Sequence, residues 1–285
     1  MNNRIHREVI GGHLLVIGGA EDKYNERRIL RKFLELAGGA EKANILIVPV
    51  SSDFPEFASD IYVQAFRRLG VQHPRVLRAT SRQDVFQAEA DELLDGVTGV
   101  FITGGDQMRL TSILGGTKFS QKLREMVSTT NLVLAGTSAG AAAMSTSMIV
   151  RGEAISHPQK NSVKISPGLG FLKNIIIDQH FTERGRISRL ITAVAYNPYN
   201  LGIGIDENTA IILDNEGVLE VFGDGTVTIV DGSQITYNEI AEVDEFQPFS
   251  ICGAQIHIMR DGLVYDYFAR QPLPVPNEFL LPDIE

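Results

Sequence analysis

The sequence predicts an α/β protein with a doubly wound, mostly parallel sheet, helices on both faces of that sheet, and antiparallel strands added in the C-terminal third. Two patterns predict this class. Through the first two thirds of the chain, short apolar runs alternate with glycine or polar turns and with helical patterns, as in successive strand–helix–strand units with right-handed crossovers. In the last third, short apolar runs are joined by Asp-Gly turns, which are typical of antiparallel hairpins.

The first strand–helix unit consists of an apolar strand at 13–17, a turn at 18–22 and a helix over 29–37. The helix is predicted because its apolar residues recur at the spacing of one helical face, and Gly38-Gly39 ends it. The strand at 44–50 is apolar on both faces, as expected for a parallel sheet that helices cover on both sides.

The remaining elements follow the same reasoning. A helix over 55–69 starts with Pro55 and ends at Gly70, the residues that favour helix starts and ends. The expected strands after it lie near 76–79, at 99–103, 131–135, 201–213, 217–222, 227–230 and 256–267. We expect the last four to join the main sheet, so that residues 1–285 form a single α/β domain with a core at 11–270 and an extended, proline-rich tail at 271–285.

The composition excludes several classes of protein. With 44% apolar and 21% charged residues among 285, the chain has the composition of a globular protein, not of a disordered one. Its formal net charge of 26 − 35 = −9 argues against a nucleic-acid-binding surface. No apolar run is long enough to span a membrane, and the first ten residues contain no apolar signal core. With a single cysteine, Cys252, the chain is expected to be cytoplasmic.

Three glycine-marked turns, at 18–22, 104–107 and 136–140, follow predicted strands, and functional sites gather at the carboxyl ends of such strands. The third turn is G-x-S-x-G, with an apolar strand before it and a small-residue helix after it. A serine on such a strand-to-helix turn exposes its hydroxyl, and the following helix aims free amides at a reacting carbonyl. Ser138 is therefore a candidate nucleophile; the alternative is a tight turn with a capping serine.

A nucleophilic serine needs a base, and histidine is the usual one near neutral pH. Of the six histidines, His180 is the best placed, because it follows the apolar run 175–177 at a predicted strand end. An acid should orient the imidazole, and Asp206 and Glu207 both end the run 201–205. Neighbours in a strand point to opposite faces, so only one of them should face the site, and the spacing does not say which.

The order serine, histidine, acid argues against an α/β-hydrolase, in which the acid precedes the histidine. The amides of Ala139 and Gly105 are candidates for an oxyanion hole. The sequence lacks both G-x-G-x-x-G and the P-loop pattern, and no two histidines have ligand spacing, so we expect no cofactor and no metal. Cys252 is not in an elbow, and we expect a buried apolar thiol there.

Five separated motifs together resemble a known family. They are IGGAEDK (17–23), FITGGDQ (101–107), GTSAGAAAM (136–144), DQHFTERGRISRL (178–190) and GIGIDENTA (202–210). In this order they resemble the cyanophycinase family of serine peptidases, which also contains aspartyl dipeptidases, and the resemblance extends from about residue 11 to 270. It implies a fold like that of class I glutamine amidotransferases, with Ser138 as nucleophile, His180 as base and Glu207 as acid.

The resemblance also implies a substrate. This is cyanophycin, a polymer with a poly-aspartate backbone and an arginine on each β-carboxyl, cut at the α-linked backbone by an exopeptidase that releases β-Asp-Arg dipeptides. Homodimers are common in the family, and neither a metal nor a cofactor is implied. The alternative within the family is a peptidase acting on small aspartyl dipeptides, and one from another class is a non-catalytic sugar or nucleotide binder.

Such a substrate carries a guanidinium and a carboxylate in each repeat unit, so its pocket should offer both signs of charge. Candidates for the guanidinium are Asp106, Gln107, Asp178 and Gln179, whose oxygens accept hydrogen bonds. Candidates for the carboxylate are Arg184, Arg186 and Arg189. On a regular helix 186 and 189 share a face and 184 does not, so at least one of these arginines is expected to serve the fold or a dimer contact.

Overall fold

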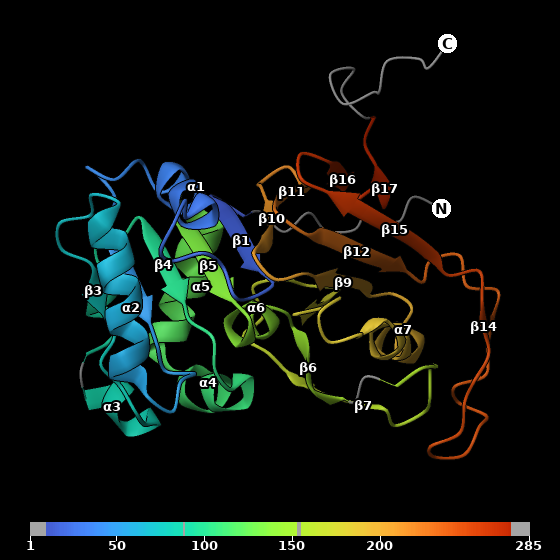
Figure 1. Ribbon diagram of the computed structural model, residues 1–285. Helices are drawn as coiled ribbons and strands as arrows, with labels where there is room; N and C mark the ends of the chain where they lie inside the picture. Colours follow the sequence, from blue (N-terminus) through green and yellow to red (C-terminus); the bar gives the residue numbers. More distant parts are fainter. Residues whose placement is uncertain (1–9, 88, 153–154, 275–285) are drawn as a thin grey trace, which may run out of the picture.

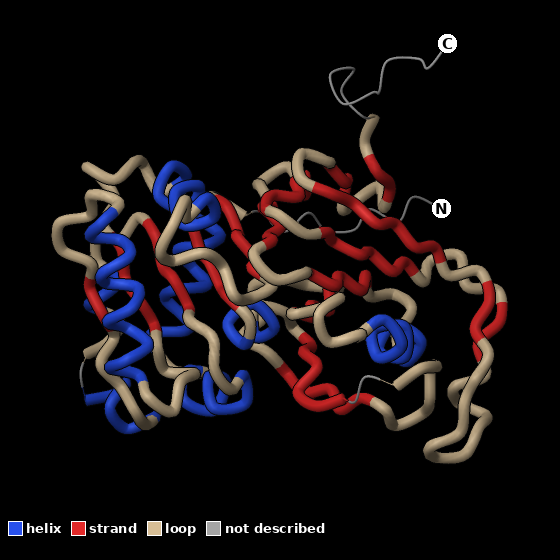
Figure 2. Tube along the Cα trace, viewed as in Figure 1, coloured by secondary structure: helices blue, strands red, loops and turns tan. Residues whose placement is uncertain are grey.

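The computed structural model describes residues 10–87, 89–152 and 155–274. Two sheets, helices on either side of them and two short hairpins make up this part of the chain (Figure 1). The larger sheet has nine strands in the order β17-β16-β11-β10-β1-β5-β4-β2-β3, and the smaller one has four in the order β15-β12-β9-β8. Figure 2 shows the helices concentrated around one half of the molecule and the strands of the C-terminal third in the other half.

The parallel half of the large sheet confirms the predicted α/β class. It consists of β1 (His13–Ile17), β2 (Ile45–Val48), β3 (Arg75–Val76), β4 (Gly99–Ile102) and β5 (Val133–Thr137), which pair with one another in parallel. Four of these strands are buried at every position except His13. Because these strands are parallel, their carboxyl ends lie at the same edge of the sheet, and the turns that follow them come together there.

Helices cover both faces of these strands. On one face, α1 (Arg28–Leu36) and α2 (Pro55–Arg68) pack on Leu15, Ile17 and their neighbours. On the other, α4 (Gln107–Leu114) and α5 (Lys118–Thr129) pack on Leu14 and Val16. Alternate residues of β1 thus belong to different cores, because successive side chains of a strand point to opposite faces. Two short helices, α3 (Arg82–Gln87) and a 3₁₀ turn (Glu92–Leu94), lie between β3 and β4.

The C-terminal strands extend the large sheet only in part. Those that join it are antiparallel: β10 (Thr209–Leu213), β11 (Val218–Gly223), β16 (Val264–Asp266) and β17 (Gln271–Pro272). The others form the second sheet: β8 (Ile175–Gln179), β9 (Leu201–Ile205), β12 (Thr226–Asp231) and β15 (Gln255–Arg260). The expectation that all of them join the main sheet was therefore wrong.

The cause of this difference is a break within the predicted strand 201–213. Asp206, Glu207 and Asn208 form a turn between β9 and β10, and Asn208 has a φ of 48°, which asparagine tolerates better than most residues. The chain consequently passes from the small sheet to the large one at this turn. The predicted strand 256–267 is divided in the same way, because Asp261-Gly262 forms a turn between β15 and β16.

The remaining elements surround the second sheet. Helix α7 (Ile187–Tyr196) packs on one of its faces through Leu190 and Val194. A first hairpin consists of β6 (Ser147–Gly152) and β7 (Val163–Pro167), and a second one of β13 (Tyr237–Asn238) and β14 (Ile251–Cys252). Cys252 is exposed, so the expectation of a buried thiol was wrong. The residue lies in β14, one of the two short strands of the second hairpin.

Of the tail at 271–285, residues 275–285 lie outside the described part of the chain. Within the described ranges, no helix is both long enough and apolar enough to cross a membrane.

Candidate active site

Ser138 occupies a strained turn between β5 and α6 (Ala139–Ala143). Its backbone has a φ of 53° and a ψ of −112°, a conformation that residues other than glycine rarely adopt and that is typical of nucleophile elbows. The flanking glycines are sterically required, because a Cβ on Gly136 would lie 2.6 Å from the Gly140 carbonyl oxygen, and one on Gly140 2.5 Å from the Ile102 carbonyl oxygen. The Ser138 amide donates to the Ile17 carbonyl oxygen (3.0 Å). This hydrogen bond attaches the turn to the end of β1.

Ser138, His180 and Glu207 are brought together from three separate turns. The Ser138 Oγ lies 2.9 Å from His180 Nε2, and His180 Nδ1 lies 2.6 Å from Glu207 Oε1. A carboxylate accepts only, so Nδ1 carries the proton and Nε2 presents its lone pair to the serine hydroxyl. The Ser138 hydroxyl has a second acceptor within reach, Gln179 Oε1 at 3.3 Å. The imidazole is mostly buried, with 12% of the side chain exposed, so its orientation is set by protein groups.

Asp206, the other acid that the sequence offered, points away from the imidazole. Its carboxylate accepts from the amides of Thr182 (3.0 Å) and Thr226 (2.9 Å) and from the Thr226 hydroxyl (2.7 Å). Burial raises the pKa of Asp206, but the hydrogen bonds from Thr182 and Thr226 outweigh it and lower the pKa below its ordinary value. Asp206 therefore fixes the turns on either side of the site, whereas Glu207 is in contact with the base.

Replacing Asp206 with asparagine is expected to lower the free energy of unfolding at pH 7 by about 1–3 kcal/mol, because an amide cannot accept from all three donors. The folded pKa of Asp206 is depressed, so its stabilisation is complete above the unfolded pKa of about 4 and is lost as the pH falls through the folded pKa. The difference between wild type and Asp206→Asn should consequently shrink at pH 3. Urea unfolding at both pH values tests this; an equal difference at both would contradict it.

The two candidate oxyanion donors lie beside Ser138. Ala139 is the first residue of α6, and the Gly104-Gly105 turn packs on Ser138, since a Cβ on Gly104 would lie 3.3 Å from the Ser138 Cβ. Within the described part of the chain, neither the Ala139 nor the Gly105 amide donates to a protein acceptor. Gly105 has a φ of 149°, and a Cβ there would lie 2.2 Å from the Ser51 carbonyl oxygen, so only glycine fits this close approach.

A buried carboxylate beneath the site was not predicted from the sequence. Glu21 is only 2% exposed; its carboxylate accepts from Thr137 Oγ1 (2.6 Å) and from the Tyr62 hydroxyl, and forms an ion pair with Lys23 Nζ (3.2 Å). Burial raises the pKa of Tyr62 well above its ordinary value, so this hydroxyl stays protonated and donates. Because Thr137 directly precedes Ser138, Glu21 connects the first glycine turn to the elbow.

The same turn also packs against His180. A Cβ on Gly19 would lie 2.4 Å from His180 Cε1, so the Gly19 backbone packs directly against the imidazole. The Gly18 carbonyl accepts from the His180 amide (2.8 Å), and the Gly19 carbonyl from the Asn208 amide (2.9 Å). The turn at 18–22 thus contacts all three segments that carry Ser138, His180 and Glu207. In the sequence this turn is marked by its glycines and by the IGGAEDK motif. Neither feature indicates that the Glu21 side chain is buried.

Replacing Glu21 with glutamine is expected to lower the free energy of unfolding by about 1–3 kcal/mol and to lower kcat as well. The new amide group would present a donor to hydroxyls that now donate, leaving buried polar groups unpaired. Glu35→Gln is the matched control, because Glu35 is exposed and pairs only with Lys32 at 3.4 Å. Chemical denaturation and steady-state kinetics of both variants test this, and indistinguishable variants would contradict it.

The predicted substrate-binding residues lie in different environments. Asp106 is exposed and caps α4 by accepting from the amides of Met108 (2.7 Å) and Arg109 (3.0 Å). Gln107 uses its amide group to donate to Ile149 O (3.0 Å). Gln179 is buried beside Ser138. Arg184 is exposed in the turn after His180, and among the described residues its side chain has no partner.

Arg186 and Arg189 are turned into the interior, toward Asp178. This carboxylate is 1% exposed and accepts from Arg189 Nε (2.6 Å), from Arg189 Nη2 and from Arg186 Nη1 (3.4 Å). Arg189 also donates to the Gly152 carbonyl (2.8 Å). Burial lowers the pKa of Arg186 to about 10, so it remains charged at neutral pH. Arg186 and Arg189 are therefore paired with Asp178 in the interior, whereas Arg184 is exposed.

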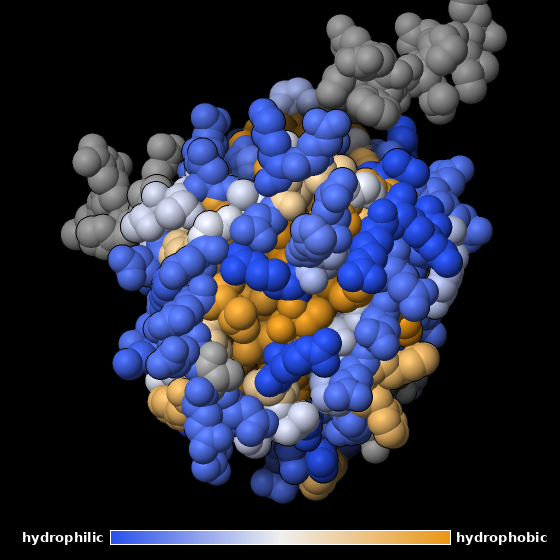
Figure 3. Space-filling view, turned by 90° about the vertical axis from the view of Figure 1, so that its left-hand side faces the viewer, coloured by the Kyte–Doolittle hydropathy of each residue, from blue (hydrophilic) through white to orange (hydrophobic). Residues whose placement is uncertain are grey.

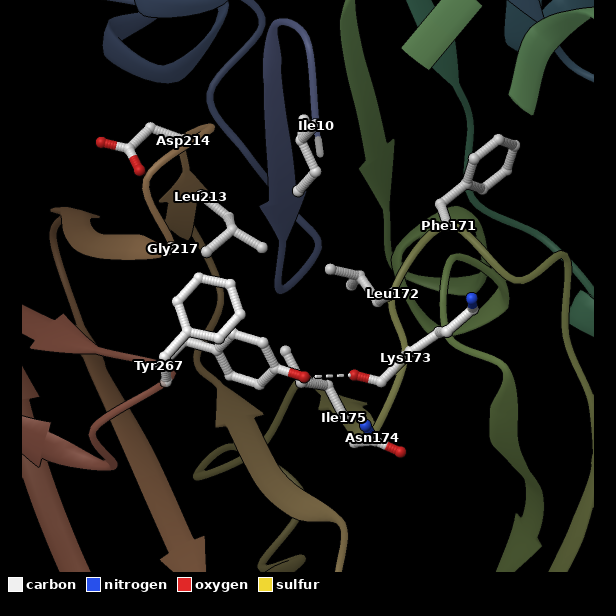
Figure 4. Close-up of a pocket in the computed structure, with 11 residues that line it drawn as sticks. Ile10, Phe171, Leu172, Lys173, Asn174, Ile175, Leu213, Asp214, Gly217 and Tyr267 are labelled. Carbon is white, nitrogen blue, oxygen red and sulfur yellow. Dashed lines mark hydrogen bonds between the residues drawn. The ribbon is translucent and has the colours of Figure 1, made fainter. Parts of the chain in front are cut away.

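Two pockets lie away from Ser138 and His180. One, of about 70 Å³, lies at the amino ends of β1 and β8 and is too small for a dipeptide. Figure 4 shows that it is mostly apolar, with the Tyr267 hydroxyl donating to the Lys173 carbonyl (2.7 Å).

The face that carries β3 is hollowed over apolar side chains (Figure 3). A pocket of about 240 Å³ near β3 is lined by residues that include Pro49, Pro55, Val76, Leu77, Ala79 and Asp84.

Comparison with known proteins identifies the family of this chain. Residues 14–221 match peptidase family S51. The chain is 39% identical to a cyanophycinase from Synechococcus elongatus over 96% of its own length and 84% of the relative's. It is 40% identical to a cyanophycinase from Nostoc sp. over 92% and 87% of the two lengths.

A solved structure shows the same fold. A crystal structure of a peptidase from an acI-B1 actinobacterium superposes with a TM-score of 0.68 at 22% identity and covers 92% of this chain and 98% of that one. The family match covers more than half of the chain, and the relatives are about 40% identical over most of it. The chain therefore belongs to peptidase family S51 and is a serine peptidase.

Proposed function

We propose that this peptidase hydrolyses cyanophycin at its α-linked aspartate backbone and releases β-Asp-Arg dipeptides, through a Ser138–His180–Glu207 triad and an acyl-enzyme. The observation that carries the proposal is the continuous hydrogen-bonded line from Ser138 Oγ to His180 Nε2 (2.9 Å) and from His180 Nδ1 to Glu207 Oε1 (2.6 Å). The relatives that are named cyanophycinase, at 39% and 40% identity, support the choice of substrate.

In the proposed reaction His180 Nε2 takes the proton of the Ser138 hydroxyl as Oγ attacks the backbone carbonyl carbon. The amides of Ala139 and Gly105 donate to the oxyanion that forms. His180 then gives its proton to the departing amine, the C–N bond breaks, and an ester on Ser138 remains. Water, deprotonated by the same imidazole, hydrolyses this ester and restores the serine. Glu207 stabilises the imidazolium in both halves of the reaction.

In this proposal, groups in and near the turns that carry the triad match the charges of the repeat unit. The exposed guanidinium of Arg184 can bind the arginine α-carboxylate as a fork. The Gln179 carbonyl oxygen, buried beside Ser138, can accept from a guanidinium. Asp106 keeps Oδ2 available, because its capping bonds use Oδ1.

Digestion of purified cyanophycin granules tests the proposal. The wild-type protein is expected to clear the suspension and to yield β-Asp-Arg, identified by mass spectrometry, whereas Ser138→Ala leaves it turbid. If the granules stay intact while small aspartyl dipeptides are cleaved, the chain is a dipeptidase and the proposed substrate is wrong. If neither substrate is cleaved, the peptidase assignment to this site is wrong as well.

A further inference from the structure

The hairpin of β6 and β7 is held firmly beside the catalytic turns. On one side, Gln107 Nε2 donates to Ile149 O (3.0 Å), and on the other, Arg189 Nη1 donates to Gly152 O (2.8 Å). Gln107 follows the Gly104-Gly105 turn, which packs on Ser138. The hairpin is therefore tied to the elements that build the site, and its exposed side chains have a fixed position relative to the nucleophile.

Two cations lie directly opposite each other on this hairpin. Arg151 and Lys164 are register partners in the antiparallel pair, next to an irregularity between Ile149 and Arg151. Both residues are exposed, and neither side chain has a hydrogen-bond or ion-pair partner in the part of the chain that the structure describes. Like charges opposite each other across two strands destabilise a hairpin. In a chain of net charge −9, such a pair indicates a site for an anionic group.

The cationic pair stands along a groove that starts at the candidate oxyanion donor. A hollow of about 460 Å³ is lined by Gly105, Asp106, Gln107, Met108 and Val150 together with Arg151 and Lys164. A second hollow, of about 210 Å³, shares Arg151 and Lys164 and continues along the hairpin to Asn161, Ser162 and Phe246. Neither hollow is lined by Ser138, His180 or Gln179. A group bound between Arg151 and Lys164 is therefore separate from the unit that reacts.

We propose that Arg151 and Lys164 form a carboxylate-binding subsite for the polymer, which takes the α-carboxylate of an arginine in a repeat unit beyond the two that flank the scissile bond. The proposal rests on the proposed function. A polymer with one free carboxylate in every repeat unit presents such groups at regular intervals, and a guanidinium and an ammonium side by side bind a carboxylate more strongly than either alone. Asp106, which lines the same groove as the pair, offers a partner for a guanidinium.

The test compares the double variant Arg151→Gln/Lys164→Gln with wild type on β-Asp-Arg oligomers of two units and of four or more units. On the longer oligomers we expect kcat/KM to fall about tenfold, through a higher KM, because charge-assisted contacts are lost. On the two-unit substrate we expect less than about a twofold change, since it does not extend to the pair. The KM for long oligomers should also depend less on salt in the double variant.

Two controls separate binding from folding and from net charge. Arg151→Lys/Lys164→Arg keeps both charges and is expected to behave as wild type, and Lys42→Gln removes an exposed cation from the loop before β2 and should change neither substrate. The thermal midpoint of the double variant should equal or exceed that of wild type, because a repulsive pair is removed.

The outcomes distinguish this subsite from the function on which it rests. If wild type cleaves both oligomers and the double variant does so equally well, or loses both equally, the subsite proposal is overturned while the proposed function stands. If wild type cleaves neither oligomer, the proposed function fails and the subsite fails with it.

Discussion

Replacing Ser138 with alanine is expected to lower kcat by at least about a thousandfold while the thermal midpoint changes little. The hydroxyl contributes two contacts, to His180 Nε2 and to Gln179 Oε1, and its removal leaves the backbone bond from the Ser138 amide to Ile17 in place. The variant therefore loses the attacking atom without losing the turn. Hydrolysis of cyanophycin followed by released dipeptide measures kcat, and a thermal melt measures stability.

Two further variants make this result specific. Ser128→Ala removes a hydroxyl that bonds only to the Glu125 carbonyl on α5 and should retain full activity. The double variant Ser138→Ala/His180→Ala should be no less active than Ser138→Ala alone, because members of a triad act as a unit and their losses do not add. Undiminished turnover by Ser138→Ala would show that another residue is the nucleophile.

The second large effect is expected for Glu207→Gln, which should lower kcat by about three to four orders of magnitude. An amide can direct its NH₂ group at His180 Nδ1, which would move the imidazole proton to Nε2 and leave no lone pair for the serine proton. The atom at stake is Glu207 Oε1, which lies 2.6 Å from Nδ1. Steady-state kinetics at saturating substrate give the loss in kcat.

Asp206→Asn is the matched control for Glu207→Gln, since it makes the same chemical change at the adjacent position. Asp206 contacts Thr182 and Thr226 and not the imidazole, so its variant should lose stability and keep most of its turnover. If Asp206→Asn lost its turnover while Glu207→Gln kept it, Asp206 and not Glu207 would be the acid that orients His180.

The parallel half of the fold was predictable because its signals are local. Strands such as β2 and β4 are short apolar runs buried on both faces, and glycine turns follow β1, β4 and β5. The partner of each C-terminal strand was not predictable, because pairing is decided by tertiary contacts. The run 201–213 is apolar on both sides of Asp206–Asn208, and nothing in it says that β9 pairs with β8 and β12 while β10 pairs with β1 and β11.

The site could be predicted as far as its residues sit in recognisable turns. Ser138 and His180 follow apolar strands, and the structure brings them to hydrogen-bonding distance. Strand alternation left Asp206 and Glu207 open, because their orientation depends on a turn with Asn208 at positive φ. Helical spacing does not describe Arg184 and Arg186, because both precede α7, which begins at Ile187. Glu21 gave no signal of burial, since its partners Tyr62 and Thr137 are distant in sequence.

The central claim, that Ser138 is the nucleophile of this peptidase, is tested most directly by covalent labelling with a fluorophosphonate followed by peptide mapping. One adduct per chain is expected, on the peptide that carries Ser138, with labelling slowed by β-Asp-Arg oligomers and abolished in Ser138→Ala. A protein that digests cyanophycin yet carries the adduct on a different residue, or none at Ser138, would contradict the account.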